Sequence, residues 1–133
     1  MIKKEIQIRF NDMDPMRRVN NASYSAYLEV ARVAFCENFI EIKTLEDIPF
    51  VMVRVEMDLL QSVLPGDKVF VTIWVSKIGN TSWEFSYKIQ SANAEITYVR
   101  AKSVQVYFNY HLGRKETIPD GFRKILESEF QSI

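Results

Sequence analysis

The sequence contains few of the residues that build metal clusters, disulfides or nucleotide-binding loops. Its 133 residues include one cysteine, Cys36, and one histidine, His111. The lone cysteine excludes an internal disulfide and a cysteine-based metal cluster, and the lone histidine argues against a zinc site or a Ser-His-Asp triad. The four glycines form no phosphate-binding motif. We therefore expect neither a metal nor a cofactor; Cys36 should be a core side chain, and His111 should lie in a solvated turn.

Excess charge and long hydrophobic runs are also missing. Lys and Arg total 17, as do Asp and Glu, and the sequence pI is near 6.6. The chain therefore has no excess of positive charge that would attract nucleic acid or an anionic membrane. The apolar runs are too short to span a bilayer, and the first ten residues alternate polar and apolar side chains instead of forming a signal peptide. We expect a cytoplasmic protein without nucleic-acid or membrane partners.

The sequence does contain enough apolar material for one packed domain. Hydrophobic residues make up 47% of the chain and charged residues 26%, which is typical of globular proteins. No repeat, low-complexity tract or linker interrupts it. We predict a single domain that spans residues 1–133.

A long and largely apolar helix is predicted near the start of the chain. Residues 3–10 alternate as a half-buried strand does, with Ile6, Ile8 and Phe10 on one face. In residues 22–39, apolar side chains then recur at steps of three and four, which is typical of a helix. The opposite face of this helix carries little charge, so we expect other elements to wrap around it.

Four long segments rich in β-branched and aromatic residues can supply this wrapping: residues 50–60, 68–77, 82–92 and 95–108. Short turn sequences between them favour antiparallel neighbours in a meander. With residues 3–10, they predict an α+β fold in which a five-stranded antiparallel sheet curls around the helix. Phe70 and Trp74 would lie on the outer face of this sheet, so we expect a second copy of the chain to cover part of it. Residues 118–130 predict a short surface helix.

The polar segment between the first strand and the long helix is the candidate site. Asp14 precedes Pro15, which disfavours a helical backbone at Asp14, so a loop presents its carboxylate. Asn20 or Asn21 is suited to cap the helix, whose first N–H groups then point back toward the loop. This arrangement suits acyl chemistry, because the N–H groups stabilise an oxyanion while the acid attacks or orients water. The same residue types are also ordinary turn formers and caps.

A longer motif contains this segment. Residues 9–32 read RFNDMDPMRRVNNASYSAYLEVAR, and a Leu-Pro-Gly-Asp turn follows at residues 64–67. These segments resemble the hotdog-fold acyl-CoA thioesterases of the 4-hydroxybenzoyl-CoA thioesterase group, whose members commonly read D-x-D-x-x-G-H-V-N-N-x-x-Y-x-x-Y-x-E-x-A-R. The sequence retains Asp12, Asp14, Val19, Asn20, Asn21, Tyr24, Tyr27, Glu29, Ala31 and Arg32. The resemblance implies a hotdog fold, with a long central helix wrapped by a five-stranded antiparallel sheet, assembled as a homodimer or homotetramer.

The resemblance also implies roles for residues in the hydrolysis of an acyl-CoA or acyl-carrier-protein thioester. Asp14 corresponds to the acid that attacks the thioester or activates water. The backbone N–H of Asn21 corresponds to the donor that binds the thioester oxygen. Glu29 would support the loop without being a reacting group itself, or it would form a structural ion pair with Arg32.

The sequence departs from the family pattern where many members have Gly-His. Arg17 and Arg18 stand there instead, which disfavours an Asp-Asn-His mechanism and leaves open the 4-hydroxybenzoyl-type mechanism, in which Asp acts without His. The two arginines could attract an anionic substrate, or they could pair with Asp12 and Asp14 and hold those carboxylates ionised.

Two further residues are candidates for binding substrate. Lys77 is the nearest match to the basic groups that hold the phosphates of coenzyme A in the family, and Tyr24 belongs to the motif itself. Because Gly-His is replaced, a non-catalytic hotdog module that binds acyl thioesters is the alternative to a hydrolase. A hydratase ranks last, because it needs a catalytic histidine and His111 lies outside the motif. The sequence does not define the acyl group.

Overall fold

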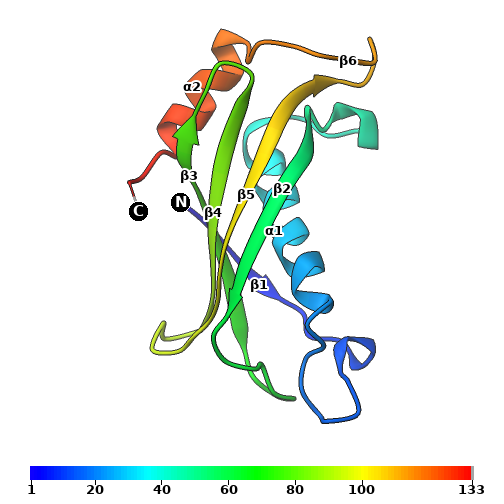
Figure 1. Ribbon diagram of the computed structural model, residues 1–133, viewed down its shortest axis with the longest axis vertical. Coiled ribbons are helices and arrows are strands. Elements are labelled where there is room, and N and C mark those ends of the chain that lie inside the picture. The colour runs from blue at the N-terminus through cyan, green and yellow to red at the C-terminus, as the bar shows by residue number, and fades with distance from the viewer. Residues whose placement is uncertain (133) are drawn as a thin grey trace.

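In the computed structural model, which describes residues 1–132, a curved sheet folds around one long helix (Figure 1). The helix is α1, Ser23–Phe39, within one residue of the prediction at its start. The main strands are β1 Ile2–Ile6, β2 Phe50–Leu59, β3 Val69–Ile78, β4 Ser82–Ser91 and β5 Thr97–Asn109. Smaller elements are the 3-10 turns η1 Phe10–Asp12 and η2 Leu45–Asp47, the short β6 Arg114–Lys115 beside β5, and α2 Asp120–Ser128. The predicted α+β fold is confirmed.

The order of strands across the sheet corrects one prediction. The sheet runs β1-β3-β4-β5-β2 with antiparallel pairs, so β3, β4 and β5 form a meander. The prediction that β2 neighbours β3 was wrong, because β2 pairs with β5 at the opposite edge. A turn closed by the Asp67 N–H and the Leu64 carbonyl (3.1 Å) redirects the chain without joining adjacent strands. Residues 60–68 thus lead from β2 at one edge of the sheet, past β5 and β4, to β3.

The first strand is shorter than predicted. Its register pairs Ile2 with Ile73 and ends where Ile6 meets Val69, the first residue of β3. Beyond Ile6 no partner backbone remains, so the chain leaves the sheet and turns into η1. Phe10 is consequently 93% exposed, and the prediction that it shares the buried face was wrong.

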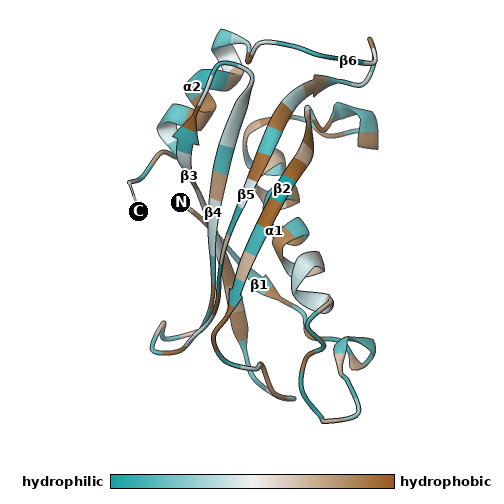
Figure 2. Cartoon of the chain, in the orientation of Figure 1, coloured by the Kyte–Doolittle hydropathy of each residue, from teal (hydrophilic) through white to brown (hydrophobic). Residues whose placement is uncertain are grey.

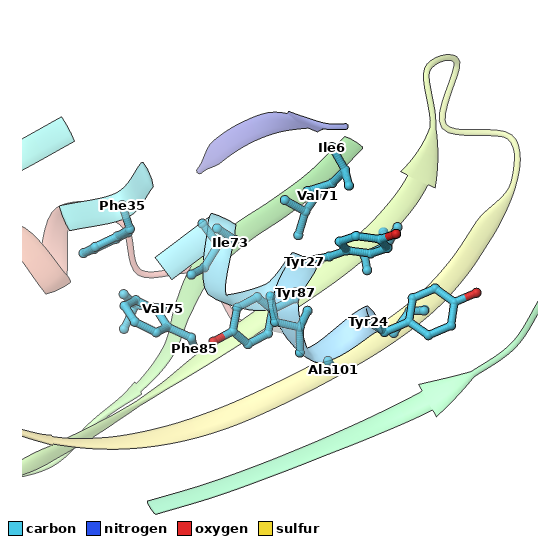
Figure 3. Packing of buried hydrophobic residues seen from close by; sticks show 14 of the residues in the cluster. Ile6, Tyr24, Tyr27, Phe35, Val71, Ile73, Val75, Phe85, Tyr87 and Ala101 are labelled. Atoms are coloured by element: carbon cyan, nitrogen blue, oxygen red, sulfur yellow. The ribbon is translucent and has the colours of Figure 1, made fainter. Parts of the chain in front are cut away.

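The core lies between α1 and the concave face of the sheet. Figure 3 shows Tyr27 and Phe35 of α1 facing Val71, Val75 and Phe85 of the strands. Val71, Val75 and Phe85 have no exposed surface, and Cys36 of α1 is buried, as predicted. The alternation of hydrophilic and hydrophobic residues along β2 and β5 is visible in Figure 2. None of the helices within residues 1–132 is both long and apolar enough to cross a membrane.

The outer face of the sheet is less exposed than the sequence suggests. Trp74 is only 7% exposed and Phe70 is half-buried. Lysine side chains cover both rings: the Lys3 Nζ lies 4.7 Å from the centre of Phe70, and the Lys88 Nζ lies 5.9 Å from Trp74. Exposed apolar side chains gather instead on β2, at Met52, Val53, Val55 and Leu59.

Phe85 and Phe10 test this assignment of core and surface. Phe85 is fully buried, and its ring centre lies 4.8 Å from that of Phe35 and 6.0 Å from that of Trp83. Phe85→Ala should lower the free energy of unfolding by about 3–5 kcal/mol, because it removes packed apolar surface and leaves a cavity. Phe10→Ala should change it by no more than about 0.5 kcal/mol. Urea unfolding of both variants checks this, and equal losses would contradict the assignment.

Candidate active site

Asp14 begins a tight hairpin between η1 and α1. Met13 and Val19 form a β-bridge at its base. The Asp14 N–H donates to the Arg18 carbonyl (2.9 Å), and the Arg17 N–H donates to the Asp14 carbonyl (3.0 Å). Pro15 fits the second position of this turn, where its fixed φ is favourable, and Asp is favoured at the first. The loop predicted from Asp14-Pro15 is therefore a closed and hydrogen-bonded turn.

Arg17 occupies the position in this hairpin that suits glycine. Its φ is +60°, in the left-handed region that only residues without a Cβ enter freely. A turn followed by one left-handed residue is a common way to close a three-residue hairpin. The family pattern has glycine here, whereas this chain has an arginine in the left-handed conformation.

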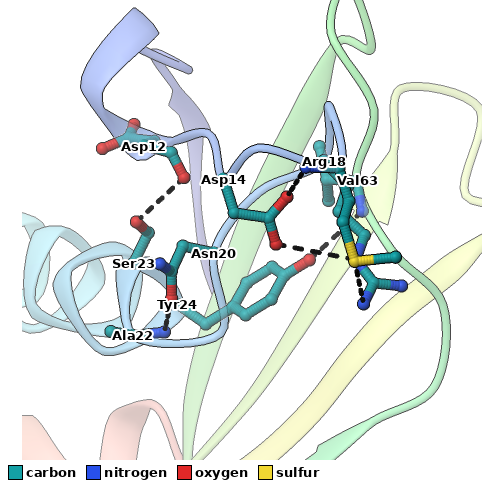
Figure 4. Close-up of polar contacts among 9 residues, drawn as sticks. Asp12, Asp14, Arg18, Asn20, Ala22, Ser23, Tyr24 and Val63 are labelled. Carbon is teal, nitrogen blue, oxygen red and sulfur yellow. Dashed lines mark hydrogen bonds and ion pairs between the residues drawn. The ribbon is translucent and has the colours of Figure 1, made fainter.

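The Asp14 carboxylate is fixed by its own loop and stays partly accessible. Its Oδ1 accepts a hydrogen bond from the Met16 N–H (2.8 Å), and its Oδ2 lies 3.7 Å from the Arg18 Nε (Figure 4). The side chain is 20% exposed. One predicted ion pair, between Asp14 and Arg18, is thus present. Arg17 makes no ion pair within residues 1–132.

Asp12 has a different role from Asp14, although both belong to the same motif. Its carboxylate is buried and accepts hydrogen bonds from the Arg9 N–H (2.9 Å) and the Tyr27 hydroxyl (2.8 Å), and the Arg9 guanidinium lies 3.3 Å away. Burial acts to raise the pKa of Asp12, but these donors together lower the pKa below its ordinary value. The expected pairing of Asp12 with Arg17 or Arg18 was wrong, because Arg9 and Tyr27 occupy the carboxylate. Figure 4 shows the two carboxylates pointing in different directions.

Main-chain contacts tie the loop to the start of α1. The Asp12 carbonyl accepts hydrogen bonds from the Asn20 N–H (2.7 Å) and the Ser23 hydroxyl (3.2 Å). The Asn20 side chain accepts the Ala22 N–H (3.0 Å), so Asn20 satisfies one of the N–H groups at the helix start. Across residues 1–132, the Asn21 N–H donates to no hydrogen bond. It is therefore free to meet an acceptor from outside the chain.

Tyr24 lies beneath this loop, where it holds the crossing connection. Its side chain is buried, and its hydroxyl accepts the Val63 N–H (3.1 Å), while the Val63 carbonyl accepts the Val19 N–H (2.9 Å) (Figure 4). The structure thus gives Tyr24 a scaffold contact, and its contact with substrate stays a prediction. The connection through Val63 was not anticipated from the sequence, because nothing in a lone valine marks it as a partner of the loop.

The remaining predicted residues lie away from Asp14. Lys77 is exposed near the end of β3, opposite Glu84, some eight residues and about 26 Å along the strand from the loop side. Glu29 lies on the exposed side of α1, about 12 Å along the helix axis from Asn21. The predicted pair of Glu29 with Arg32 was wrong, because Arg32 instead donates to the Tyr87 hydroxyl at 3.2 Å.

The single cysteine and histidine lie outside this site. Burial raises the pKa of Cys36 to about 12, with a further contribution from Glu37, so its thiol is unreactive. His111 is exposed, as predicted, and lies 3.6 Å from Asp47. In the described part of the chain, no group of three or more His, Cys, Asp or Glu side chains is arranged to hold a metal.

Comparisons with known proteins identify the family. A family model described as the thioesterase-like superfamily matches residues 8–126. Because this match spans most of the sequence, the chain belongs to the thioesterase-like superfamily. Comparison with curated protein sequences finds no match.

Solved structures share the fold over nearly the whole chain. A predicted thioesterase from Bacillus stearothermophilus is 26% identical with a TM-score of 0.89, and the alignment covers 98% of this chain and 97% of that one. A thioesterase from Thermus thermophilus, complexed with coenzyme A and Zn, is 30% identical with a TM-score of 0.84 over 95% and 91% of the two chains. A 1,4-dihydroxy-2-naphthoyl-CoA thioesterase from Synechocystis, 16% identical, has a TM-score of 0.80 over 93% of each chain and shows the fold alone.

The role of Asp12 can be tested by removing its charge. Asp12→Asn keeps the shape but loses charge-assisted hydrogen bonds, so the free energy of unfolding at pH 7 should fall by about 1.5–3 kcal/mol. Because folding lowers the pKa of Asp12, the ionised group stabilises the native state above the ordinary Asp pKa of about 3.9, and this contribution is lost as the pH falls through the lowered value. The difference between wild type and variant should therefore shrink below about pH 4 in urea unfolding. A difference that is constant from pH 7 to pH 2 would contradict the assignment.

The backbone strain at Arg17 predicts a stabilising substitution. Arg17→Gly relieves the left-handed conformation but gives the unfolded chain more freedom, and the net gain should be about 0.5–1 kcal/mol in the free energy of unfolding. Ala94 has φ +61° in the turn between β4 and β5, so Ala94→Gly is a matched control without a charged side chain. Both variants should raise the melting temperature. A loss of stability in both would show that the strain is absent.

Proposed function

We propose that the protein hydrolyses an acyl thioester to a free acid and a thiol, with Asp14 and the Asn21 N–H as the reacting groups. Membership of the thioesterase-like superfamily supports the reaction class. The observation that carries the proposal is the fixed hairpin: hydrogen bonds hold the Asp14 carboxylate in the loop that leads into α1, and at the end of this loop the Asn21 N–H has no acceptor among residues 1–132.

The two groups divide the chemistry between them. Thioester hydrolysis places negative charge on the carbonyl oxygen as the carbon is attacked, and the Asn21 N–H would donate to that oxygen. Asp14 would remove a proton from the attacking water, or would itself attack the carbonyl carbon and be released by water afterwards. In both routes the carbon–sulfur bond breaks, and the thiolate takes up a proton.

Several features favour acyl-CoA over an acyl-carrier-protein as the substrate. The thioesterase from Thermus thermophilus binds coenzyme A, and it is 30% identical to this chain. Arg17 and Arg18 are exposed beside Asp14, where they could meet the phosphates of the carrier group. Lys77 lies near the end of β3, and its contact with the carrier stays a prediction. Assignment to the 4-hydroxybenzoyl-CoA group within the family remains part of this proposal.

A homodimer or a dimer of dimers fits the surface of the chain. β2 lies at the edge of the sheet, so one side of its backbone has no strand beside it within residues 1–132. Its exposed apolar side chains are the kind of surface that a partner covers. An antiparallel second copy centred on Val55 would also place each Arg54 opposite a Glu56. This edge replaces the outer face of the sheet as the proposed contact.

One observation favours the alternative, a module that binds thioesters without cleaving them. Arg18 lies 3.7 Å from the Asp14 carboxylate, where the family pattern has histidine. A guanidinium has only hydrogen-bond donors, so Arg18 cannot accept a proton from water as an imidazole can. Such a module would bind a coenzyme A ester and release no thiol.

Asp14→Asn tests the hydrolase directly. It preserves the shape of the side chain but removes the base or nucleophile, so kcat/KM for thiol release from the best acyl-CoA substrate should fall by about 10²–10⁴-fold. Asp47→Asn is a matched control, because Asp47 also accepts loop N–H groups, those of Lys43 and Thr44, in an exposed turn. The control should retain full activity. Thiol release by Asp14→Asn at the wild-type rate would refute the mechanism, whereas ester binding without release by the wild type would identify the module.

A further inference from the structure

Arg18 lies beside the free oxygen of the Asp14 carboxylate. The Oδ1 atom of Asp14 accepts the Met16 N–H (2.8 Å), whereas Oδ2 accepts no hydrogen bond within residues 1–132. The Arg18 Nε lies 3.7 Å from Oδ2, which is an ion-pair distance but too long for a hydrogen bond. Oδ2 is therefore the oxygen that is able to attack a substrate, and a guanidinium lies next to it.

The Arg18 guanidinium already has a sulfur atom against it. Its Nη2 donates to the Met16 Sδ at 3.6 Å (Figure 4). Met16 is 70% exposed, so packing does not hold its side chain in place. A divalent sulfur thus fits beside this guanidinium, next to Asp14, and a substrate sulfur can displace the exposed methionine.

Direct attack by Asp14 creates a need for positive charge near the substrate sulfur. The tetrahedral intermediate can then expel either the Asp14 carboxylate or the thiolate. The ordinary pKa of Asp is about 3.9 and that of a Cys thiol about 8.5, so the carboxylate leaves more readily and the attack tends to reverse. When water attacks instead, the competing leaving group is hydroxide, which is far more basic than a thiolate. Only the direct route needs stabilisation at the sulfur.

We propose that Asp14 is the nucleophile and that Arg18 is a further catalytic residue, which stabilises the thiolate as it leaves. This role rests on the proposed hydrolase function. That function assigns the carbonyl oxygen to the Asn21 N–H, so the sulfur is the second substrate atom that gains charge. A guanidinium is a permanently charged donor, and hydrogen bonds from charged donors are among the strongest.

The distances allow one substrate to meet both side chains. In an attack geometry the carbonyl carbon lies about 3–3.5 Å from the attacking oxygen, so the sulfur bonded to this carbon comes within a few ångströms of Oδ2. The Arg18 Nε is 3.7 Å from the same oxygen. The role needs no surface beyond the one that a thioester must already reach at Asp14, and Arg18 is not part of the β2 edge that a second copy would cover.

Atoms and electrons balance along this route. A bond forms between Asp14 Oδ2 and the carbonyl carbon, and the π pair moves onto the oxygen at the Asn21 N–H. When the carbonyl forms again, the carbon–sulfur bond breaks and its electron pair leaves on the sulfur. Arg18 keeps its protons, and the thiolate takes a proton from water. The remaining hydroxide attacks the anhydride, which frees the acid and restores the Asp14 carboxylate.

Esters of one acyl group with three thiols test this role. Coenzyme A and N-acetylcysteamine are both alkyl thiols, but only coenzyme A carries phosphates, and thiophenol is more acidic, so that its anion leaves unaided. Arg18→Gln should lower kcat by about tenfold or more for both alkyl thioesters, and by less than about threefold for the thiophenyl ester. Arg18→Lys keeps the charge and should recover part of the loss. Both variants should melt close to the wild type, because an exposed ion pair contributes little stability.

Arg114→Gln is a matched control. The Arg114 Nε lies 3.5 Å from the Glu116 carboxylate, in an ion pair like that of Arg18 but on β6. This variant should hydrolyse all three esters at the wild-type rate.

The other outcomes for Arg18→Gln each overturn the role of Arg18. Equal losses for the three esters would assign it to the oxyanion or to the fold of the loop, and a loss with the coenzyme A ester alone would assign it to the phosphates. An unchanged or higher kcat would show that the guanidinium does not stabilise the thiolate. All these results leave the hydrolase intact, since the wild type still releases thiol. Absence of thiol release from every ester by the wild type would instead refute the proposed function, and the role of Arg18 with it.

Discussion

The arrangement of the candidate site depends on one buried carboxylate. Asp12 accepts hydrogen bonds from Arg9, three residues beyond the end of β1, and from Tyr27 of α1, while its own carbonyl accepts hydrogen bonds from Asn20 and Ser23. The segment after β1, the loop and the helix thus meet at a single residue. Asp14 lies two residues further along the chain, so its position depends on the hydrogen bonds of Asp12 and on the hairpin that follows. A change that loosens the contacts of Asp12 would therefore shift the Asp14 carboxylate as well.

Two of the buried charged residues, Asp12 and Arg32, have opposite surroundings. Asp12 is surrounded by donors, so its charge stabilises the native state. Arg32, eight residues beyond Tyr24 on the same helix, has one neutral partner and faces a cavity. The first pattern is that of a structural group, whereas the second leaves a guanidinium without a counter-charge among residues 1–132.

The sequence predicts the parts of this structure that depend on local pattern. The long helix and the strands β3 to β5 follow from periodicity, and the Asp14-Pro15 turn follows from the preferences of those two residues. Neighbours in space are harder to infer: two aspartates in one motif look alike, and only the folded chain brings Tyr27 to Asp12. The crossing of residues 60–68 and the contact of Arg32 with Tyr87 also depend on which strands pair, and turn chemistry does not encode that. The motif indicated the region of the candidate site, but it did not indicate which side chains form hydrogen bonds with one another.

The register of β1 governs when the chain can fold during synthesis. Ile2 pairs with Ile73 and Ile6 with Val69, so β1 has no partner strand until β3 has emerged from the ribosome. Throughout that interval the apolar surface of α1 lacks its cover. Folding therefore requires contacts between residues that are far apart in the sequence. Such contacts form slowly, and until they form the apolar surface is exposed to aggregation. The nascent chain should accordingly depend on chaperones until β3 has been translated.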